Sequence, residues 1–176
     1  MPADRVYNVL FLCTGNSARS ILGEALLNHL AGDGFHGYSA GSHPKGEVNP
    51  MTLEVLSETG IPLDGLRSKS WDEFAATDAP KMDFVFTVCD DAAGETCPIW
   101  PGHPLTAHWG IEDPARVGGQ EFRRKAAFED ALRYMRNRIT AFINLPLTSI
   151  DQMSLQTKLR DIGEMDGATR HSPRVA

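Results

Sequence analysis

The stretch Cys-Thr-Gly-Asn-Ser-Ala-Arg-Ser at residues 13–20 constrains this chain more than any other. It follows the apolar run 9–12 and precedes a helical spacing of apolar residues that starts near Ile21. This order predicts a buried strand, a tight loop and a helix. Such a loop turns its backbone N–H groups toward one point at the positive end of the helix dipole, which suits a tetrahedral oxyanion. The sequence therefore predicts an oxyanion pocket formed by Thr14, Gly15, Asn16, Ser17, Ala18 and Arg19.

Two side chains of this stretch carry chemistry. Arg19 follows Cys13 by six residues, and its planar fork of donors fits an oxyanion in a bidentate manner. A thiol beside a helix N-terminus and an arginine is expected to have a lowered pKa, so Cys13 is predicted to be a nucleophile. Ser20 is predicted to donate a hydrogen bond to that sulfur, and Asn16 to hold the loop by bonding its backbone. The structural alternative is a small apolar cysteine at the end of a buried strand.

The rest of the chain alternates strand and helix patterns and predicts an α/β fold, a doubly wound four-stranded parallel sheet with flanking helices. Strands are expected at 6–12, 35–40, 82–88 and 105–109, and helices at 21–31, 50–59, 71–76, 120–145 and 150–162. Ligands of such sheets bind at the carboxyl ends of the strands. The first, third and fourth strands lead to Cys13, Cys89 and the loop that contains Asp113, so these groups are predicted to converge.

The composition narrows the function classes. A chain of 176 residues is expected to form one catalytic domain at 1–146, followed by a C-terminal helix and flexible tail at 147–176. The formal net charge of −6 argues against nucleic acid or an anionic membrane as a partner. Three cysteines without a Cys-x-x-Cys pair indicate reduced thiols and a cytoplasmic location, and no signal peptide or membrane span is expected. The basic side chains of the last long helix are expected to form a solvated face: Arg123, Arg124, Lys125, Arg133, Arg136 and Arg138.

The loop resembles the phosphate-binding loop of the low-molecular-weight protein tyrosine phosphatase superfamily. Its Cys-Thr-Gly-Asn-Ser beginning is typical of the arsenate reductase branch, and the resemblance extends over residues 6–145. It implies a phosphatase-I-like three-layer sandwich, an oxidoreductase acting on arsenate, a role in arsenical resistance, and no tightly bound cofactor.

The resemblance also implies roles for the second and third cysteines. In this branch the cysteine after the third strand attacks the nucleophile, and a third cysteine attacks it in turn; Cys89 and Cys97 match these positions. The disulfide is then reduced by thioredoxin or glutaredoxin. The spacing of Cys89 and Cys97 is one residue longer than in the thioredoxin-coupled branch, so the donor stays open. The structural alternatives are a core cysteine at the end of a strand for Cys89 and a free loop thiol for Cys97.

Asp113-Pro114 resembles the aspartate loop of the same superfamily, which implies that Asp113 protonates the leaving oxygen. An Asp-Pro pair is otherwise a turn signal. Two further functions stay open: a low-molecular-weight protein tyrosine phosphatase, and a non-enzymatic oxyanion or redox sensor. Some relatives bind potassium through groups that match Asn16, Glu24 and Ser39, but the further carboxylate is absent near 68–70, so no metal is expected.

Overall fold

The computed structural model describes residues 5–90 and 98–169. Its elements alternate between strand and helix along most of the chain. In chain order they are β1 (Tyr7–Leu12), α1 (Arg19–Leu30), β2 (Phe35–Ala40), α2 (Pro50–Glu58), α3 (Asp72–Ala75), β3 (Phe84–Thr87), β4 (Leu105–His108), α5 (Glu121–Ile143) and α6 (Gln152–Gly163). The alternation predicted from the sequence is confirmed, with ends that differ by one or two residues in most elements.

The four strands form one parallel sheet in the order β2-β1-β3-β4, which confirms the predicted fold class. The last residues of the strands lie level with one another: Leu12 pairs with Ala40 on one side and with Thr87 on the other, and Thr87 pairs with His108. The segments that leave β1, β3 and β4 therefore begin at the same edge of the sheet.

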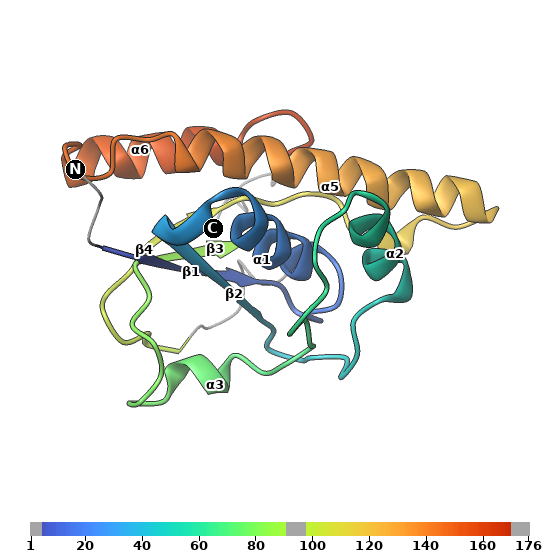
Figure 1. Ribbon diagram of the computed structural model, residues 1–176, viewed down its shortest axis with the longest axis horizontal. Coiled ribbons are helices and arrows are strands. Elements are labelled where there is room, and N and C mark those ends of the chain that lie inside the picture. The colour runs from blue at the N-terminus through green and yellow to red at the C-terminus, as the bar shows by residue number, and fades with distance from the viewer. Residues whose placement is uncertain (1–4, 91–97, 170–176) are drawn as a thin grey trace, which may run out of the picture.

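Side chains of the strands alternate between two apolar layers. One face, which includes Phe11 and Phe86, packs against α1, α5 and α6, and the other, which includes Leu10 and Val85, packs against Phe74 of α3 and its neighbours. Figure 1 shows α5 and α6 along the upper side of the sheet and α3 on the opposite side. The sheet is thus buried on both faces, as its nearly continuous apolar strands predict.

Two helix starts follow from local chemistry. Asn49 caps α2 as predicted, because its side chain accepts a hydrogen bond from the backbone N–H of Met51 and Pro50 occupies the first helical position. Helix α1 begins at Arg19, two residues before the expected start, because the backbone N–H of Leu22 already donates to the Ala18 carbonyl. Arg19 is consequently held by the first turn of a helix.

The C-terminal segment departs from the sequence prediction. A flexible tail was expected after α6, but residues up to 169 pack against the sheet edge, where Ala168 forms an antiparallel bridge with Ile111. Arg138 explains this packing: its side chain is fully buried instead of solvated, and its guanidinium donates to the carbonyls of Gly163, Met165 and Asp166. Residues 170–176, which belong to the same prediction, lie outside the described residues.

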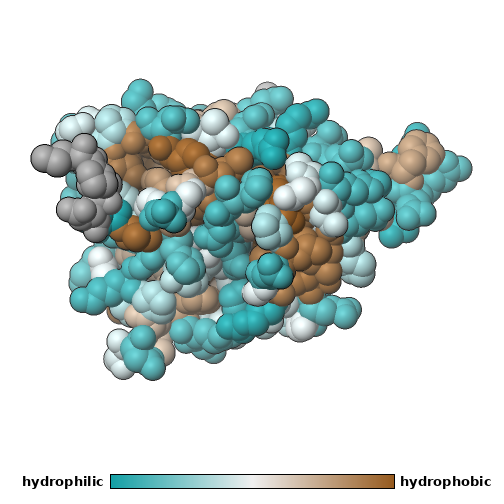
Figure 2. Space-filling view, viewed as in Figure 1, coloured by the Kyte–Doolittle hydropathy of each residue, from teal (hydrophilic) through white to brown (hydrophobic). Residues whose placement is uncertain are grey.

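The outer surface is largely polar. Figure 2 shows hydrophilic side chains along the upper edge, where α5 and α6 lie, and hydrophobic ones gathered beneath them. Within residues 5–90 and 98–169, no helix is both long and apolar enough to cross a membrane.

Candidate active site

A cavity of about 380 Å³ lies at the carboxyl edge of the sheet. Its wall contains the whole stretch 13–19, together with Cys89 after β3 and Asp113 after β4. The predicted convergence of these three chain segments is therefore observed. His43, Lys45, Ala115 and Arg116 complete the lining.

The loop is held by its carbonyl groups. The carbonyls of Thr14, Gly15 and Ser17 accept hydrogen bonds from the backbone N–H groups of His43, Lys45 and Asn49, at 3.0, 3.0 and 2.9 Å. A peptide unit points its N–H away from its own carbonyl, so outward carbonyls leave the N–H side of the loop facing the cavity. Such a backbone arrangement suits an anion, and the binding of one by this loop stays a prediction.

Asn16 is the conformational centre of the loop. It is fully buried and has a φ of 44°, a left-handed conformation that asparagine tolerates better than most residues. Its Oδ1 accepts a hydrogen bond from the backbone N–H of Lys69 at 2.8 Å, and its Nδ2 donates to Ser20 Oγ at 2.8 Å. Asn16 therefore fastens the loop to the segment before α3, whereas the prediction had it bond the loop's own backbone.

Ser20 lies fully buried in the first turn of α1. Its oxygen accepts the hydrogen bond from Asn16, so its own hydroxyl hydrogen is left to donate to another acceptor. The hydrogen bond from Ser20 to the Cys13 sulfur stays a prediction.

Arg19 spans the cavity toward Asp113. Its Nη1 donates to the Ile111 carbonyl at 2.9 Å, and its Nη2 lies 3.6 Å from Asp113 Oδ2. Its Nε is buried and has no hydrogen-bond partner among the described residues. A buried guanidinium donor without an acceptor is costly.

Cys89 lies against the same loop. Its sulfur accepts a hydrogen bond from the backbone N–H of Thr14 at 3.3 Å, and it lines the same cavity as Cys13. Both thiols are buried, at 6% exposure for Cys13 and 2% for Cys89. The structure therefore places the second thiol in the same cavity as the first, as the predicted convergence of the strand ends implies.

The expectation of a lowered pKa for Cys13 is wrong for this arrangement. The hydrogen bond with the Cys89 thiol, followed by burial, holds the pKa of Cys13 well above its usual value of 9.0. Arg19 and the backbone N–H of Gly15 act in the opposite direction and do not outweigh these two causes. The sequence contained the lowering groups in one stretch, but the raising group lies 76 residues away from Cys13 along the chain.

Asp113 both caps a turn and lines the cavity, although the sequence left these two roles as alternatives. Its Oδ1 accepts a hydrogen bond from the backbone N–H of Ala115 at 3.0 Å and so caps the short 3-10 turn Pro114–Arg116. Its Oδ2 faces the guanidinium groups of Arg19 and Arg116, at 3.6 and 3.8 Å. The carboxyl group is thus fixed at the cavity wall, while its role as an acid stays a prediction.

Lys69 is a functional candidate that sequence reasoning missed. It is 7% exposed, and its ammonium lies 3.4 Å from Glu24 Oε1, 3.4 Å from Ser39 Oγ and 3.0 Å from the Arg67 carbonyl. Burial lowers the pKa of Lys69 below its usual value, although Glu24 opposes the shift. Glu24 and Ser39 match residues that bind potassium in some relatives, and in this chain the Lys69 ammonium contacts both.

The third cysteine, Cys97, lies outside the described residues. Among residues 5–90 and 98–169, no cluster of three or more histidine, cysteine, aspartate or glutamate side chains is arranged to hold a metal ion.

The fold and the loop define the class of the protein. The chain belongs to the low molecular weight phosphotyrosine protein phosphatase family, whose model matches residues 8–144. Within this family its similar relatives include arsenate reductases. The arsenate reductase of Bacillus subtilis (strain 168) is 37% identical over 134 residues, which are 76% of this chain and 93% of that protein. The arsenate reductase of Staphylococcus aureus (strain N315) is 37% identical over 116 residues, 66% of this chain and 85% of that protein.

Solved structures give the same picture. The thioredoxin-dependent arsenate reductase of Corynebacterium glutamicum superposes with a TM-score of 0.57 and 29% identity over 80% of this chain, but this chain spans only 61% of that one. The arsenate reductase of Archaeoglobus fulgidus superposes with a TM-score of 0.61 and 26% identity over 78% of this chain and 99% of that one.

Proposed function

We propose that this chain is an enzyme that reduces arsenate to arsenite through its cysteine thiols. The observation that carries the proposal is the position of the Cys89 thiol, which lines the same cavity as Cys13 and accepts a hydrogen bond from the backbone N–H of Thr14, the residue after Cys13. A phosphatase of this fold requires one thiolate, an arginine and an acid. Only a reaction that transfers electrons from the protein requires a second thiol within reach of the first.

The first step would bind arsenate in the loop, with donors from its backbone and from Arg19. The Cys13 thiolate attacks arsenic and forms a sulfur–arsenic bond, while one oxygen leaves as water with a proton from Asp113. Because the pKa of Cys13 is raised, its proton must be lost in this step. The oxygens of the bound arsenate dianion are available to accept the Cys13 proton.

The second step would release the product. The Cys89 thiolate attacks the Cys13 sulfur, a disulfide forms, and the electron pair of the sulfur–arsenic bond stays on arsenic, which leaves as arsenite. Arsenic gains the two electrons that the two thiols lose. Cys97 would then attack Cys89, free Cys13 and leave a disulfide between Cys89 and Cys97.

An external dithiol must reduce that disulfide. The relative from Corynebacterium glutamicum is thioredoxin-dependent, and we propose thioredoxin as the donor, with glutaredoxin as the alternative. A relay of this kind needs reduced thiols, which fits a cytoplasmic enzyme.

The decisive test is arsenite formation by the wild-type chain and by separate Cys13→Ser, Cys89→Ser and Cys97→Ser variants, with thioredoxin or glutaredoxin as donor. We expect loss of turnover for Cys13→Ser and Cys89→Ser with either donor. Cys97→Ser is expected to lose turnover with thioredoxin and to keep part of it if glutaredoxin can resolve the first disulfide. Unchanged turnover of Cys89→Ser would contradict the proposal.

The family also contains tyrosine phosphatases, so a phosphatase is the second candidate. The described lining of the cavity includes no Phe, Tyr or Trp side chain to flank an aryl group; Ala115 and Arg116 follow the Asp113-Pro114 pair instead. Hydrolysis of an aryl phosphate by Cys89→Ser, faster than arsenate reduction by the wild type, would favour this candidate. Multiple turnovers with a thiol donor would exclude a non-enzymatic sensor.

A further inference from the structure

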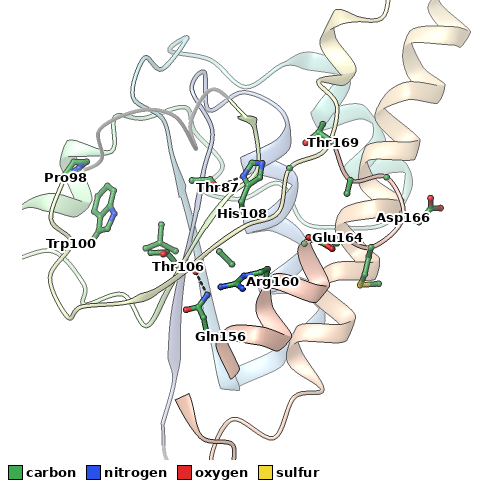
Figure 3. A pocket seen from close by; sticks show the side chains of 17 residues that line it. Thr87, Pro98, Trp100, Thr106, His108, Gln156, Arg160, Glu164, Asp166 and Thr169 are labelled. Carbon is green, nitrogen blue, oxygen red and sulfur yellow. Dashed lines mark hydrogen bonds between the residues drawn. The ribbon is translucent and has the colours of Figure 1, made fainter. Parts of the chain in front are cut away.

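Asp90, the residue that follows Cys89, is held by two side chains from distant parts of the chain. Its Oδ1 lies 2.8 Å from His108 Nε2 at the end of β4, and accepts a second hydrogen bond, also 2.8 Å long, from Thr169 Oγ1. His108 Nδ1 in turn lies 2.8 Å from Thr87 Oγ1 on β3. Figure 3 shows Thr87 and His108 together, joined by a dashed line, and Thr169 on the C-terminal segment.

The donors and acceptors of this cluster form one consistent chain. A carboxylate is an acceptor, so His108 Nε2–H donates to Asp90, and in the neutral imidazole Nδ1 then accepts the Thr87 hydroxyl. Gly110 lies directly against the cluster. A Cβ atom there would collide with Thr169 Oγ1, His108 Nε2 and Asp90 Oδ1. The three polar atoms are thus packed on backbone that has no side chain.

Thr169 lies beyond the part of the chain that matches the family, which ends at residue 144. Its position is fixed by the fold: its backbone N–H donates to the Gly110 carbonyl at 3.1 Å, and Ala168 bridges Ile111. The carbonyls at the end of α6, six to three residues before Thr169, are bound by the buried Arg138. We call residues 145–169, which follow the part that matches the family, the C-terminal extension. It holds Thr169 in place as a hydrogen-bond donor to Asp90.

The cluster borders open space. Thr87, His108 and Thr169 line a cavity of about 1190 Å³, which shares no lining residue with the oxyanion cavity. Beside this cavity, His108 and Thr169 each form a hydrogen bond with Asp90 Oδ1. Removal of one of them should therefore shift the backbone next to Cys89 and leave the oxyanion loop intact.

We propose that Thr169 and His108 are positioning residues: by holding Asp90, they keep the Cys89 thiol beside Cys13 for its attack on the Cys13 sulfur. The C-terminal extension thus serves the release of arsenite, and does not serve oxyanion binding. This inference rests on the proposed function, because the attack of Cys89 belongs to that reaction.

The test uses Thr169→Val, which removes the donor hydroxyl but keeps the shape, in a Cys97→Ser parent that stops after the first disulfide. Arsenate is added to the reduced protein, and the formation of the Cys13–Cys89 disulfide and of arsenite is followed in a single turnover. We expect both rates to fall about tenfold, the effect of losing one hydrogen bond to a charged group at the attacking step. Protection of Cys13 from iodoacetamide by inorganic phosphate should stay unchanged.

Two further variants separate positioning from general damage. Thr169→Ser keeps the hydroxyl and should restore the parent rates. Gln156→Ala removes another hydrogen bond between the extension and the sheet, from Gln156 Nε2 to the Thr106 carbonyl, and should leave the rates unchanged.

Parent-like rates for Thr169→Val, or an equal slowing by Gln156→Ala, would overturn the inference. A loss of phosphate protection in Thr169→Val would overturn it as well, because the loop itself would then be disturbed. If the parent protein forms neither the disulfide nor arsenite, the proposed function fails, and the parent alone reveals this.

Discussion

At the scale of single residues, the two thiols define each other's chemistry. Cys13 lies near groups that favour a thiolate, yet the hydrogen bond with Cys89 and burial favour the thiol. Cys89, which would form the disulfide with Cys13, therefore also keeps the Cys13 thiol protonated. Protonation protects a buried thiol from adventitious oxidation, since the thiolate is the reactive form.

Removal of Cys89 should lower the pKa of Cys13. In the Cys97→Ser parent, a further Cys89→Ala change deletes the largest cause of the raised pKa and leaves burial in place. The rate of Cys13 alkylation by iodoacetamide, measured against pH, should rise at a lower pH than in the parent. An unchanged or higher midpoint would show that Cys89 does not set this pKa.

The raised pKa also predicts a pH dependence of stability. A cysteine whose pKa in the folded protein exceeds its unfolded value of about 9.0 stabilises the folded state below that pH. This contribution disappears as the pH rises through the folded pKa. Chemical denaturation should show a steeper decline of the unfolding free energy above pH 9 in the wild type than in Cys13→Ala.

The charge of Lys69 should stabilise the folded protein, because it neutralises the buried Glu24 carboxylate. Lys69→Met leaves the Glu24 carboxylate buried without its cation, which should cost about 3 kcal/mol of unfolding free energy. The double variant Lys69→Met/Glu24→Gln removes both charges and should recover most of this loss. Equal losses in the single and double variants, measured by urea denaturation, would show that the unpaired Glu24 charge is not the cause of the loss.

At the scale of elements, α6 adds a close contact to the edge strand β4. Gly163 at its end lies so near the His108 carbonyl that a Cβ atom would collide with it, and the Trp109 indole N–H donates to the Leu159 carbonyl at 2.9 Å. The helix can therefore approach the strand only because residue 163 has no side chain.

Gly163→Ala should destabilise the protein, although glycine to alanine in a helix is ordinarily favourable. The collision with backbone forces α6 away from β4, which should cost about 1–3 kcal/mol in thermal or urea unfolding. Lys158→Ala, at an exposed position of the same helix, serves as control and should change stability by less than about 0.5 kcal/mol. A stabilising effect of Gly163→Ala would contradict the contact.

At the scale of the whole molecule, the periodicity of the chain was sufficient to predict the sheet, the helices and the edge at which Cys13, Cys89 and Asp113 meet. Local patterns carry this information because strand ends in a parallel sheet share one edge. The contacts of the Lys69 ammonium with Glu24 and Ser39, and those of the buried Arg138 with the segment after α6, join residues far apart in sequence. No local sequence pattern predicts such contacts. A basic residue on a helix, such as Arg138, is therefore expected to be solvated unless its carbonyl partners are known.

The charge of the whole molecule makes substrate capture local. The net charge of −6 opposes an arsenate dianion, so the basic groups at the cavity must overcome it. Lys45→Gln should lower kcat/KM for arsenate about threefold at low salt and less at high salt. Lys158→Gln, with the same change in net charge far from the cavity, should have little effect; an equal loss in both variants would refute local attraction.

Trp109 lies between the sheet and α6, so its fluorescence can report on the contact between them. The ring is fully buried, stacks on Phe86 at 3.8 Å between ring centroids, and donates its N–H to α6, while Trp71 and Trp100 lie together on the opposite face of the sheet. The chain contains three tryptophans. With Trp71 and Trp100 replaced by phenylalanine, the emission of the remaining indole becomes an intrinsic optical reporter of C-terminal docking during turnover, with no added label.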